Sequence, residues 1–305
     1  MTALVVEAVG PLTLVEDLGR PGHASIGVTG SGAADRRALR LANRLLGNAE
    51  GAPALEVLLG GLAVRAEGTV RVCVTGAPAP LHVDDRAAPL DAPFDLPDGR
   101  LLSLGMPSTG LRTYLAVRGG LDEPLVLGSA STDPTMGVGP APLTPGRRLA
   151  VRPADRGGAA PADVDVAAPT APPVTDVVVR AVVGPRDDWF APTAVPTLLS
   201  QPWTVSADTD RVGVRLTGPR LDRVADSRPS DRGHSASAPP ELPSEAVVRG
   251  AVQVPHSGQP LVFLADHPPT GGYPVIAVVA DDDTDVLAQL RPGERVRFRR
   301  IPRGW

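Results

Sequence analysis

Proline and glycine interrupt this chain so often that few stretches are long enough to form a helix. The 305 residues include 35 Pro and 33 Gly, and both residues are unfavourable inside helices and strands. Between them lie short runs rich in β-branched and other apolar residues. Ten such runs are evident: ALVVEAV, LTLVEDL, ALEVLL, VRVCVTG, TYLAVRG, DVVVRAVVG, VGVRLTG, LVFLA, PVIAVVA and RVRFRRI. This pattern predicts a mainly β fold with mostly antiparallel sheets, in barrels or sandwiches.

Only two segments predict helices. In SGAADRRALRLANRLLGN, Ser31 is the expected N-cap and Gly47 the expected end, and one face is apolar. That face comprises Ala38, Leu41, Ala42 and Leu45. The second segment, DTDVLAQLRPG, predicts a short helix that ends at Pro292 and Gly293.

The periodicity is lost between Arg152 and Thr175, where Pro, Ala, Asp and Gly dominate. This composition is typical of a linker or a long surface loop. We therefore predict an N-terminal domain at residues 1–152, a linker at 153–175 and a C-terminal domain at 176–305. A second polar stretch, Ala225–Glu245, is predicted to be a loop within the C-terminal domain.

Charge and residue usage exclude several classes of function. The net charge is -4, which gives no reason to expect nucleic acid or an anionic membrane as a partner. All 30 basic residues are arginine, so the chain cannot supply a Schiff-base lysine, a Walker A lysine or a biotinylated lysine. The five histidines and one cysteine lack zinc-ligand spacing, and no metal site is predicted.

Two further features concern the cellular compartment of the protein. No basic-then-apolar leader and no run of 18 apolar residues is present, so we expect a cytoplasmic protein. The single cysteine, Cys73, lies in an apolar run and is expected to be a small core residue.

The first polar constellation is EDLGRPGHASIGVTGSGAADRRA, which leads into the first predicted helix. A Gly-rich loop at a helix N-terminus can present free amides to a carboxylate or phosphate, and Arg20 can add a bidentate contact. On the alternative interpretation the glycines only form turns, and Asp35 stabilises the first helical turn.

A second constellation, DTDRVGVRL, places Asp210, Arg211 and Arg215 at the start of a predicted strand. Such pairs are commonly structural. If the strand lines a site, Arg211 or Arg215 is expected to contact an anionic group.

The third constellation is LADHPPTGGYPVIAVV, in which Asp266 and His267 follow a strand. Neighbouring side chains of a strand face opposite sides, so the two are not expected to form a dyad. The prolines and glycines that follow turn the chain sharply. This stretch is either a structural corner or the rim of a site in which His267 transfers protons.

Six ordered motifs identify a family resemblance. They are VEDLGRPGHASIGVTGSGAADRRALRLANRLLGN, ALEVLLGG, TYLAVRGGLDEPLVLGSAST, DRVGVRLTG, SEAVVRGAVQVPHSGQPLVFLADHPPTGGYPVIAVV and LAQLRPGERVRF. Together they resemble the 5-oxoprolinase C-subunit family, whose members are also called allophanate hydrolase subunit 2 or biotin-dependent carboxyltransferase. The same module is similar to part of urea amidolyase.

The resemblance implies two cyclophilin-like β-barrel domains with a few short helices. It implies a hydrolase component that acts on 5-oxo-L-proline together with the B-subunit of 5-oxoprolinase, which is allophanate hydrolase subunit 1-like. The A-subunit would complete ring opening to glutamate. ATP with Mg would be shared with the partner or bound by it.

Two alternatives remain open from the resemblance. One is the carboxyltransferase component of a urea-type carboxylase, with biotin carried on another protein. The other is a regulatory binding protein that antagonises a kinase inhibitor. The location of ATP, the oligomeric state and the choice between 5-oxoproline, urea and another amide are left open.

The resemblance also implies site residues where the motifs match. Asp266 and His267 are the expected catalytic residues. The expected substrate-binding residues are Arg20, Ser31, Asp35, Arg211, Gln253, Gln259, Thr270, Gly271, Gly272 and Tyr273. On this basis Asp266→Ala is expected to abolish substrate-dependent ATP turnover and to leave folding intact.

Overall fold

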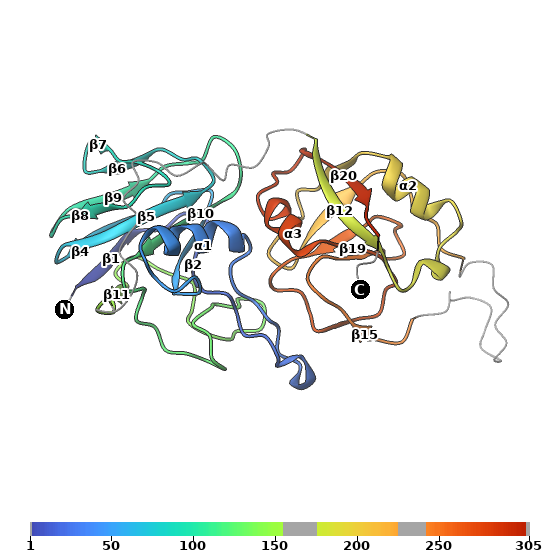
Figure 1. The fold of residues 1–305 in the computed structure, drawn as a ribbon, viewed down its shortest axis with the longest axis horizontal. Helices are drawn as coiled ribbons and strands as arrows, with labels where there is room; N and C mark the ends of the chain where they lie inside the picture. Colours follow the sequence, from blue (N-terminus) through green and yellow to red (C-terminus); the bar gives the residue numbers. More distant parts are fainter. Residues whose placement is uncertain (1, 155–175, 225–241, 303–305) are drawn as a thin grey trace. The chain divides into compact units, whose positions relative to one another are not determined.

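The computed structural model describes residues 2–154, 176–224 and 242–302. The chain forms two compact units, Met1–His23 with Thr29–Pro172 and Ala24–Val28 with Pro173–Trp305. The boundary after Pro172 falls within the predicted linker, and most of the linker lies outside the described residues, as does most of the predicted loop Ala225–Glu245. Both units are mainly β, so the predicted fold class is confirmed (Figure 1). No helix in the described ranges is long and apolar enough to span a membrane.

The N-terminal unit consists of two antiparallel sheets. The first has the order β11-β1-β4-β9-β6-β7 and the second the order β2-β3-β10-β5-β8. The first-sheet strands are β1 (Ala3–Ala8), β4 (Ala63–Glu67), β6 (Leu81–Val83), β7 (Arg86–Ala87), β9 (Leu101–Leu104) and β11 (Arg148–Ala150). The second-sheet strands are β2 (Leu12–Glu16), β3 (Ala54–Leu58), β5 (Val70–Gly76), β8 (Phe94–Leu96) and β10 (Arg112–Val117).

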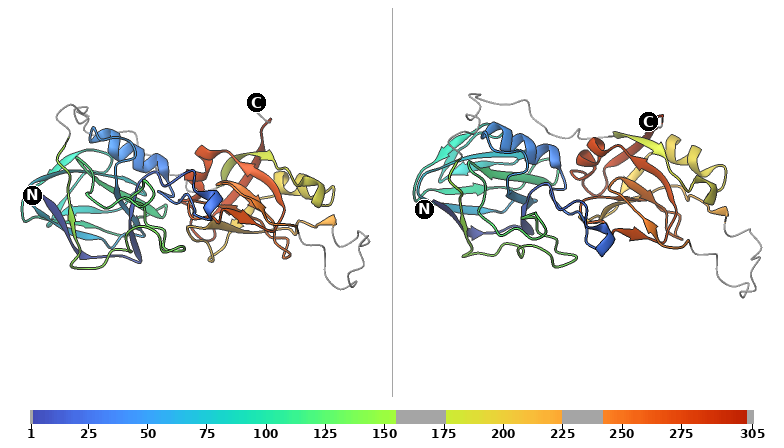
Figure 2. Two further views of the ribbon diagram at one scale, coloured as in Figure 1. Left: turned by 90° about the horizontal axis from the view of Figure 1, so that it is seen from below. Right: turned by 60° about the horizontal axis from the view of Figure 1, so that its bottom comes forward.

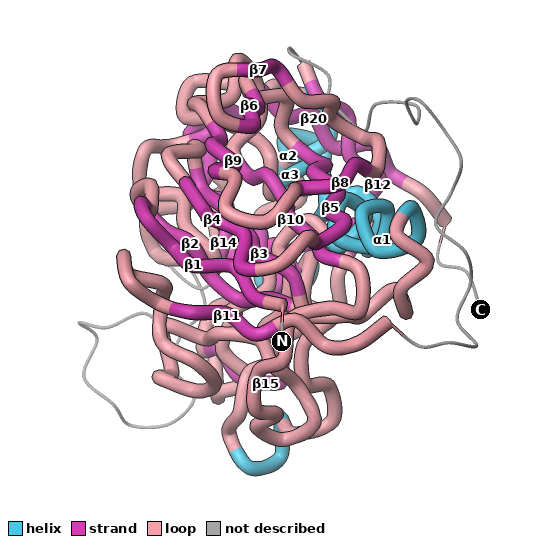
Figure 3. The backbone as a smooth tube through the Cα atoms, turned by 90° about the vertical axis from the view of Figure 1, so that its left-hand side faces the viewer, coloured by secondary structure: helices cyan, strands magenta, loops and turns pink. Residues whose placement is uncertain are grey.

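The core of this unit lies between the two sheets. Leu4 and Val64 of the first sheet belong to one buried cluster with Val57 and Leu115 of the second. The other face of the second sheet is covered by α1 (Arg36–Leu45), which packs on β5 and β10 (Figures 1 and 3). Burial of both faces of this sheet explains why β10 is apolar at most positions rather than alternating.

The C-terminal unit is a closed barrel with the strand order β12-β19-β16-β17-β14-β13-β20. Its strands are β12 (Val177–Val183), β13 (Trp203–Val205), β14 (Gly213–Thr217), β16 (Ala251–Gln253), β17 (Leu261–Phe263), β19 (Val275–Val279) and β20 (Arg295–Arg300). The parallel pair β12 and β20 is the exception among antiparallel neighbours. Two further strands, β15 (Glu245–Ala246) and β18 (Thr270–Gly271), pair with each other outside the barrel.

Two helices and two 3₁₀ turns complete the described elements. In the C-terminal unit, α2 (Ala194–Ser200) packs on β20 and α3 (Asp281–Leu287) packs on β12, both outside the barrel wall (Figure 2). The 3₁₀ turns are η1 (Ala24–Ile26) and η2 (Asp187–Trp189).

Both predicted helices are present, but not every predicted boundary was correct. The N-cap of α1 is Asp35, whose side chain accepts a hydrogen bond from the amide of Ala38, so the prediction of Ser31 was wrong. The amide of Gly47 donates to the carbonyl of Arg44 with φ 69°, which confirms a glycine at the end of this helix. The second predicted helix is α3, which begins at Asp281, two residues before the predicted start, and ends at Leu287.

Beneath α1, Cys73 is fully buried, which confirms that it is a core residue. Burial raises the pKa of its thiol to about 12, and the charge of Asp91 contributes to the shift. Asp91 is itself buried, and its Oδ1 atom has no hydrogen-bond partner among the described residues. Burial raises the pKa of Asp91 to about 6.

We expect Asp91→Asn to stabilise the protein above pH 6. The folded state binds the proton of Asp91 more tightly than the unfolded state, so the wild-type chain loses stability as the pH rises from about 4 through about 6. Removing the charge should raise the free energy of unfolding at pH 8 by about 1–2 kcal/mol after allowance for solvent screening. Urea unfolding at pH 4 and pH 8 measures this gain, which should be much smaller at pH 4. A variant that is less stable than wild type at pH 8 would contradict the assignment.

Candidate functional site

Asp17 organises the first polar loop through its carboxylate. Oδ1 accepts hydrogen bonds from the amide of Gly19 at 2.6 Å and from the hydroxyls of Ser129 at 2.7 Å and Ser131 at 2.6 Å. Oδ2 accepts one from the amide of Ala130 at 2.7 Å. Three of these four bonds tie the turn after β2 to a segment more than 110 positions later in the sequence.

Glycine is required where the two arms of this loop touch. Gly19 has φ 85°, and a Cβ there would lie 2.5 Å from the carbonyl oxygens of Gly30 and Ser31. Gly32 has φ 95°, and its Cβ would lie 2.7 Å from the amide nitrogen of Gly19. Any side chain at either position would force the arms apart.

Arg20 is 1% exposed, and its guanidinium binds backbone carbonyls. Nη2 donates to the carbonyl of Ser131, and Nε donates to that of Val126 at 3.4 Å. Nη1 is buried without a hydrogen-bond partner in the described part of the chain. The predicted ligand contact of Arg20 therefore has one donor that the described chain does not use.

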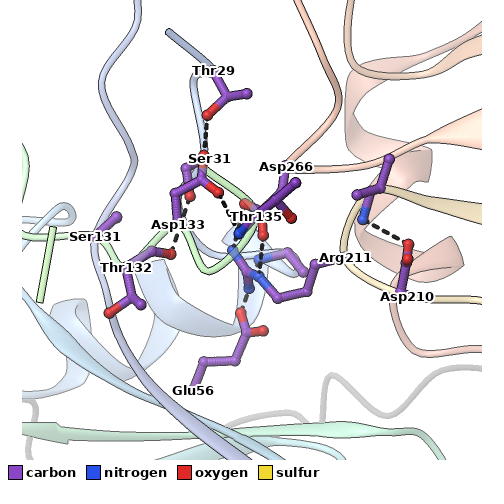
Figure 4. Close-up of polar contacts among 12 residues, drawn as sticks. Thr29, Ser31, Glu56, Ser131, Thr132, Asp133, Thr135, Asp210, Arg211 and Asp266 are labelled. Carbon is purple, nitrogen blue, oxygen red and sulfur yellow. Dashed lines mark hydrogen bonds and ion pairs between the residues drawn. The ribbon is translucent and has the colours of Figure 1, made fainter. Parts of the chain in front are cut away.

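Ser31 and Thr29 hold the same distant segment (Figure 4). The hydroxyl of Ser31 donates to the carbonyl of Thr132 at 3.2 Å, and that of Thr29 donates to the carboxylate of Asp133. Ser31 has φ 48°, so its backbone turns the loop rather than starting the helix. The structure thus brings the predicted residues Arg20 and Ser31 together on residues 131–132.

The predicted anion site at the N-terminus of α1 is not present in the expected form. The amide of Ala34 donates to Oε2 of Glu56 at 2.9 Å, and the amide of Asp35 donates to the hydroxyl of Tyr114 at 2.8 Å. Because Glu56 is buried, the loop amides already have an anion from within the chain. The same carboxylate accepts from Tyr114 at 2.7 Å and pairs with buried Arg112 at 3.3 Å.

Tyr114 stays protonated in this network. Burial, followed by the charges of Glu56 and Asp35, raises the pKa of its hydroxyl well above the ordinary value. The hydroxyl can therefore donate to Glu56 and accept from the amide of Asp35 at the same time. Asp35, predicted to bind substrate, is the N-cap of α1 and lies within this buried network.

In the C-terminal unit, Arg211 and Asp266 form a buried bidentate ion pair (Figure 4). Nε of Arg211 donates to Oδ2 at 2.7 Å, and Nη2 donates to Oδ1 at 3.0 Å. The amide of Asp266 also donates to the carbonyl of Arg211 at 3.0 Å. Arg215, by contrast, is exposed on β14. The sequence named both members of the pair but did not predict that they bind each other.

The turn after Asp266 is supported by Gln253 of β16. Its Nε2 donates to the carbonyl of Tyr273 at 2.9 Å, and a Cβ on Gly271 would lie only 2.5 Å from that nitrogen. Thr270 and Gly271 form β18, whose backbone pairs with β15. Gly272 lies in more open space, where the nearest neighbour of a Cβ would be the carbonyl of Leu242 at 3.6 Å.

His267 is partly exposed and lies against Phe263, with 5.8 Å between ring centroids. Nδ1 is 2.8 Å from the carbonyl oxygen of Pro268. A carbonyl only accepts hydrogen bonds, so Nδ1 carries the proton and Nε2 has the lone pair in the neutral ring. Tyr273 is 39% exposed and meets the ring of His256 edge-on at 5.5 Å.

Gln259 has a structural position. Its Oε1 accepts from the amide of Gly218 at 2.8 Å, and its Nε2 donates to the carbonyl of the same residue at 3.1 Å. These two bonds bind the residue that follows β14 and use both polar atoms of the Gln259 side chain. They favour a structural role over the predicted substrate contact.

Several residues of the two clusters were not predicted. Glu56, Tyr114, Ser129, Ser131 and Asp133 all contact predicted residues or the loop that bears them. One signal was available, because Glu56 is a charged residue in the middle of the apolar run ALEVLL. A buried charge in a strand needs a partner, which the sequence alone does not identify.

Comparisons with known proteins identify relatives over nearly the whole chain. A family model described as the carboxyltransferase domain, subdomain A and B, matches residues 26–300. The 5-oxoprolinase C-subunit of Escherichia coli (strain K12) is 37% identical over 292 residues, which cover 95% of this chain and 88% of that protein.

Two solved structures are also similar. The crystal structure of TTHA0988 is 35% identical with a TM-score of 0.84, over 98% of this chain and 55% of that chain. The K. lactis urea amidolyase structure is 30% identical with a TM-score of 0.85, over 97% of this chain and 18% of that chain. The chain thus spans about half of TTHA0988 and less than a fifth of the urea amidolyase.

Proposed function

The chain belongs to the carboxyltransferase family of subdomains A and B, and from this premise we propose that it is the C-subunit of an ATP-dependent 5-oxoprolinase. The single observation that carries the proposal is the 37% identity to the 5-oxoprolinase C-subunit over 95% of this chain and 88% of that protein. A match that covers almost all of both chains supports a shared role better than a match to one part of a longer enzyme.

In this role the chain works in a complex and not alone. We propose that it binds the B-subunit, that the A-subunit is required for ring opening, and that the complex is a cytoplasmic hydrolase. The net reaction adds water across the lactam C–N bond of 5-oxo-L-proline to give glutamate, driven by hydrolysis of ATP to ADP and phosphate. We expect the isolated chain to be inactive.

The turn from Asp266 to Pro274 is the part of the chain that we propose meets the lactam. In the neutral ring of His267, Nε2 has the lone pair and can take a proton from water or from a reacting group. Both carboxylate oxygens of Asp266 are held by Arg211, so we assign Asp266 a positioning role rather than proton transfer. Gln253 and Gly271 fix the backbone of the same turn.

ATP with Mg is part of the proposed reaction, but the loop before α1 does not fit its phosphates. The amides of Ala34 and Asp35 are bonded to Glu56 and Tyr114, and the carboxylate of Glu56 would repel a phosphate placed beside it. We therefore propose that the partner protein binds or completes the ATP site, and we derive no step through ATP on this chain.

A second candidate function is the carboxyltransferase component of a biotin-dependent urea-type carboxylase. It is favoured by the description of the family model and by the TM-score of 0.85 to urea amidolyase. Because the chain has no lysine, biotin would have to arrive on another protein.

The experiment is ATP turnover by the co-purified complex of this chain with its B-subunit and A-subunit partners. We expect 5-oxo-L-proline to stimulate phosphate release at least about tenfold and urea to have no effect. His267→Gln should lower kcat by about 10²–10⁴-fold, the usual contribution of a general base. His82→Gln on β6 is the matched control and should turn over normally. Urea-dependent carboxylation with a biotinylated carrier would favour the second function instead.

A further inference from the structure

The N-terminal unit contains a cavity of about 410 Å³ that no motif of the sequence predicted. One stretch of chain between β10 and β11 lines it, and most of the lining is apolar. The lining includes Pro124, Val126, Gly139, Ala141, Pro142 and Leu143. The proline rings fix the backbone on both sides of the cavity, so its shape is largely preformed.

The charged groups of the lining neutralise each other. Nη2 of Arg147 donates to both carboxylate oxygens of Glu123, at 3.0 and 2.9 Å. Glu123 is buried, whereas the side chain of Arg147 is half-exposed at the rim. An anionic ligand would therefore find no unpaired cation among the lining residues themselves.

The guanidinium of Arg20, a cation without a counter-ion in the described ranges, lies against two residues that line the cavity. Nε of Arg20 donates to the carbonyl of Val126, and a Cβ added to Gly139 would lie 3.1 Å from Nη2. Val126 and Gly139 both line the cavity, so the backbone of these two residues separates it from the guanidinium. Arg20 forms no ion pair in the described ranges, and its Nη1 is buried without an acceptor there. A buried charge without an ion pair lowers the stability of the folded state unless an anion binds to it.

The backbone over Arg20 belongs to no strand and is held by an isolated bridge. Val126 and Ser129 form an isolated bridge with bonds of 2.8 and 3.2 Å, and the carbonyl of Val126 is 3.4 Å from Nε of Arg20. The flanking Leu125 and Leu127 are exposed rather than packed in the core. A carboxylate is a stronger acceptor for a guanidinium than a backbone carbonyl at that distance. If residues 125–127 moved away from Arg20, the long hydrogen bond from Nε to the Val126 carbonyl would be replaced by a charged hydrogen bond to the ligand carboxylate.

We propose that this cavity binds a small carboxylic acid, with the carboxylate on Arg20 in place of the Val126 carbonyl and the apolar body against Pro142 and Leu143. The identity of the acid rests on the proposed function, under which it is 5-oxo-L-proline, and the cavity is then a binding site additional to the turn Asp266–Pro274. The three saturated carbons of its ring can contact the apolar lining, its lactam N–H and C=O would face solvent at the cavity mouth, and its single carboxylate needs one cation, which Arg20 supplies.

Binding to the full-length chain tests the proposal without a change to buried Arg20. The probes are 5-oxo-L-proline, 2-pyrrolidone, which lacks only the carboxylate, and acetate, measured by ligand-observed NMR titration at low salt. We expect 2-pyrrolidone to bind at least about tenfold more weakly than 5-oxo-L-proline, because it loses a charge-assisted hydrogen bond. Ala141→Trp fills the cavity from an exposed position and should weaken 5-oxo-L-proline binding by a similar factor. Ala87→Trp, on exposed β7, is the matched control and should bind like wild type.

The outcomes separate this proposal from the proposed function. Equal binding of 5-oxo-L-proline and 2-pyrrolidone, or unchanged binding by Ala141→Trp, overturns the cavity site. If the Ala141→Trp complex also keeps 5-oxoproline-dependent ATP hydrolysis with the wild-type KM, the proposed function stands without the cavity. If the complex shows no such hydrolysis but acetate binds in a manner sensitive to Ala141→Trp, the carboxylate site stands and the proposed function fails.

Discussion

Replacing Asp266 with alanine is expected to lower the free energy of unfolding of the C-terminal unit by about 3–5 kcal/mol, because it breaks a buried, bidentate ion pair with Arg211. Arg211 is 5% exposed and directs Nε and Nη2 at the two oxygens of Asp266. With alanine at position 266 the buried guanidinium loses both hydrogen bonds to the carboxylate. The expectation from sequence that this substitution leaves folding intact is revised on this ground.

Tryptophan fluorescence during urea unfolding measures this loss in the correct unit. All three tryptophans of the chain belong to residues 173–305, and Trp203 is fully buried in β13. The signal therefore reports the C-terminal unit without a contribution from the N-terminal one.

The control is the double variant Arg211→Met, Asp266→Leu. It removes both charges and replaces them with apolar groups of similar volume, so its stability should lie near that of wild type or above it. A single Asp266→Ala variant with stability within about 1 kcal/mol of wild type would contradict a strong buried pair. Turnover of the stable double variant then distinguishes a positioning role of the pair from a purely structural one.

The second large effect is expected for Asp17→Ala, at about 4 kcal/mol or more. The substitution leaves the buried hydroxyls of Ser129 and Ser131 and the amides of Gly19 and Ala130 without their acceptor. Each buried donor left unsatisfied costs about 1–3 kcal/mol. Since the same segment carries the carbonyl that holds Arg20, the loop and the arginine should lose order together.

Hydrogen exchange is the suitable measurement because the N-terminal unit has no tryptophan. Amides in residues 17–35 and 129–133 should lose protection, whereas those of the β1–β4 pair should lose less. The matched control is Asp95→Ala, which removes an exposed ion pair with Arg71 and should change little. Wild-type protection of residues 129–133 in Asp17→Ala would refute the role of this carboxylate.

The ten strands predicted from apolar runs are all present. Alternating apolar residues and β-branched side chains favour the extended backbone locally, and packing in the sheets stabilises the same conformation. Shorter strands such as β6 and β8 were not predicted, since three residues give too little pattern to separate from a loop. The helix α2 was also not predicted. It contains Pro196 in its first turn, where proline is tolerated but where a sequence pattern indicates a break.

The N-cap of α1 shows what local rules could not predict. Ser31 and Asp35 are both good capping residues and both precede the apolar face of α1. The hydroxyl of Ser31 is instead bound to the carbonyl of Thr132, 101 positions later, which left Asp35 as the cap. A capping rule that considers only neighbouring residues does not include a hydrogen bond to a residue 101 positions away.

The sequence by itself determined the mainly β class, the places where the chain turns and the classes of chemistry that the absence of lysine rules out. Only the tertiary structure decided which polar residues meet. Arg211 binds Asp266, Asp17 binds Ser131 and Ala34 binds Glu56 across separations of 55, 114 and 22 residues. Propensities act over a few neighbouring residues, whereas these pairs depend on sheet register and on the cost of burying a charge alone.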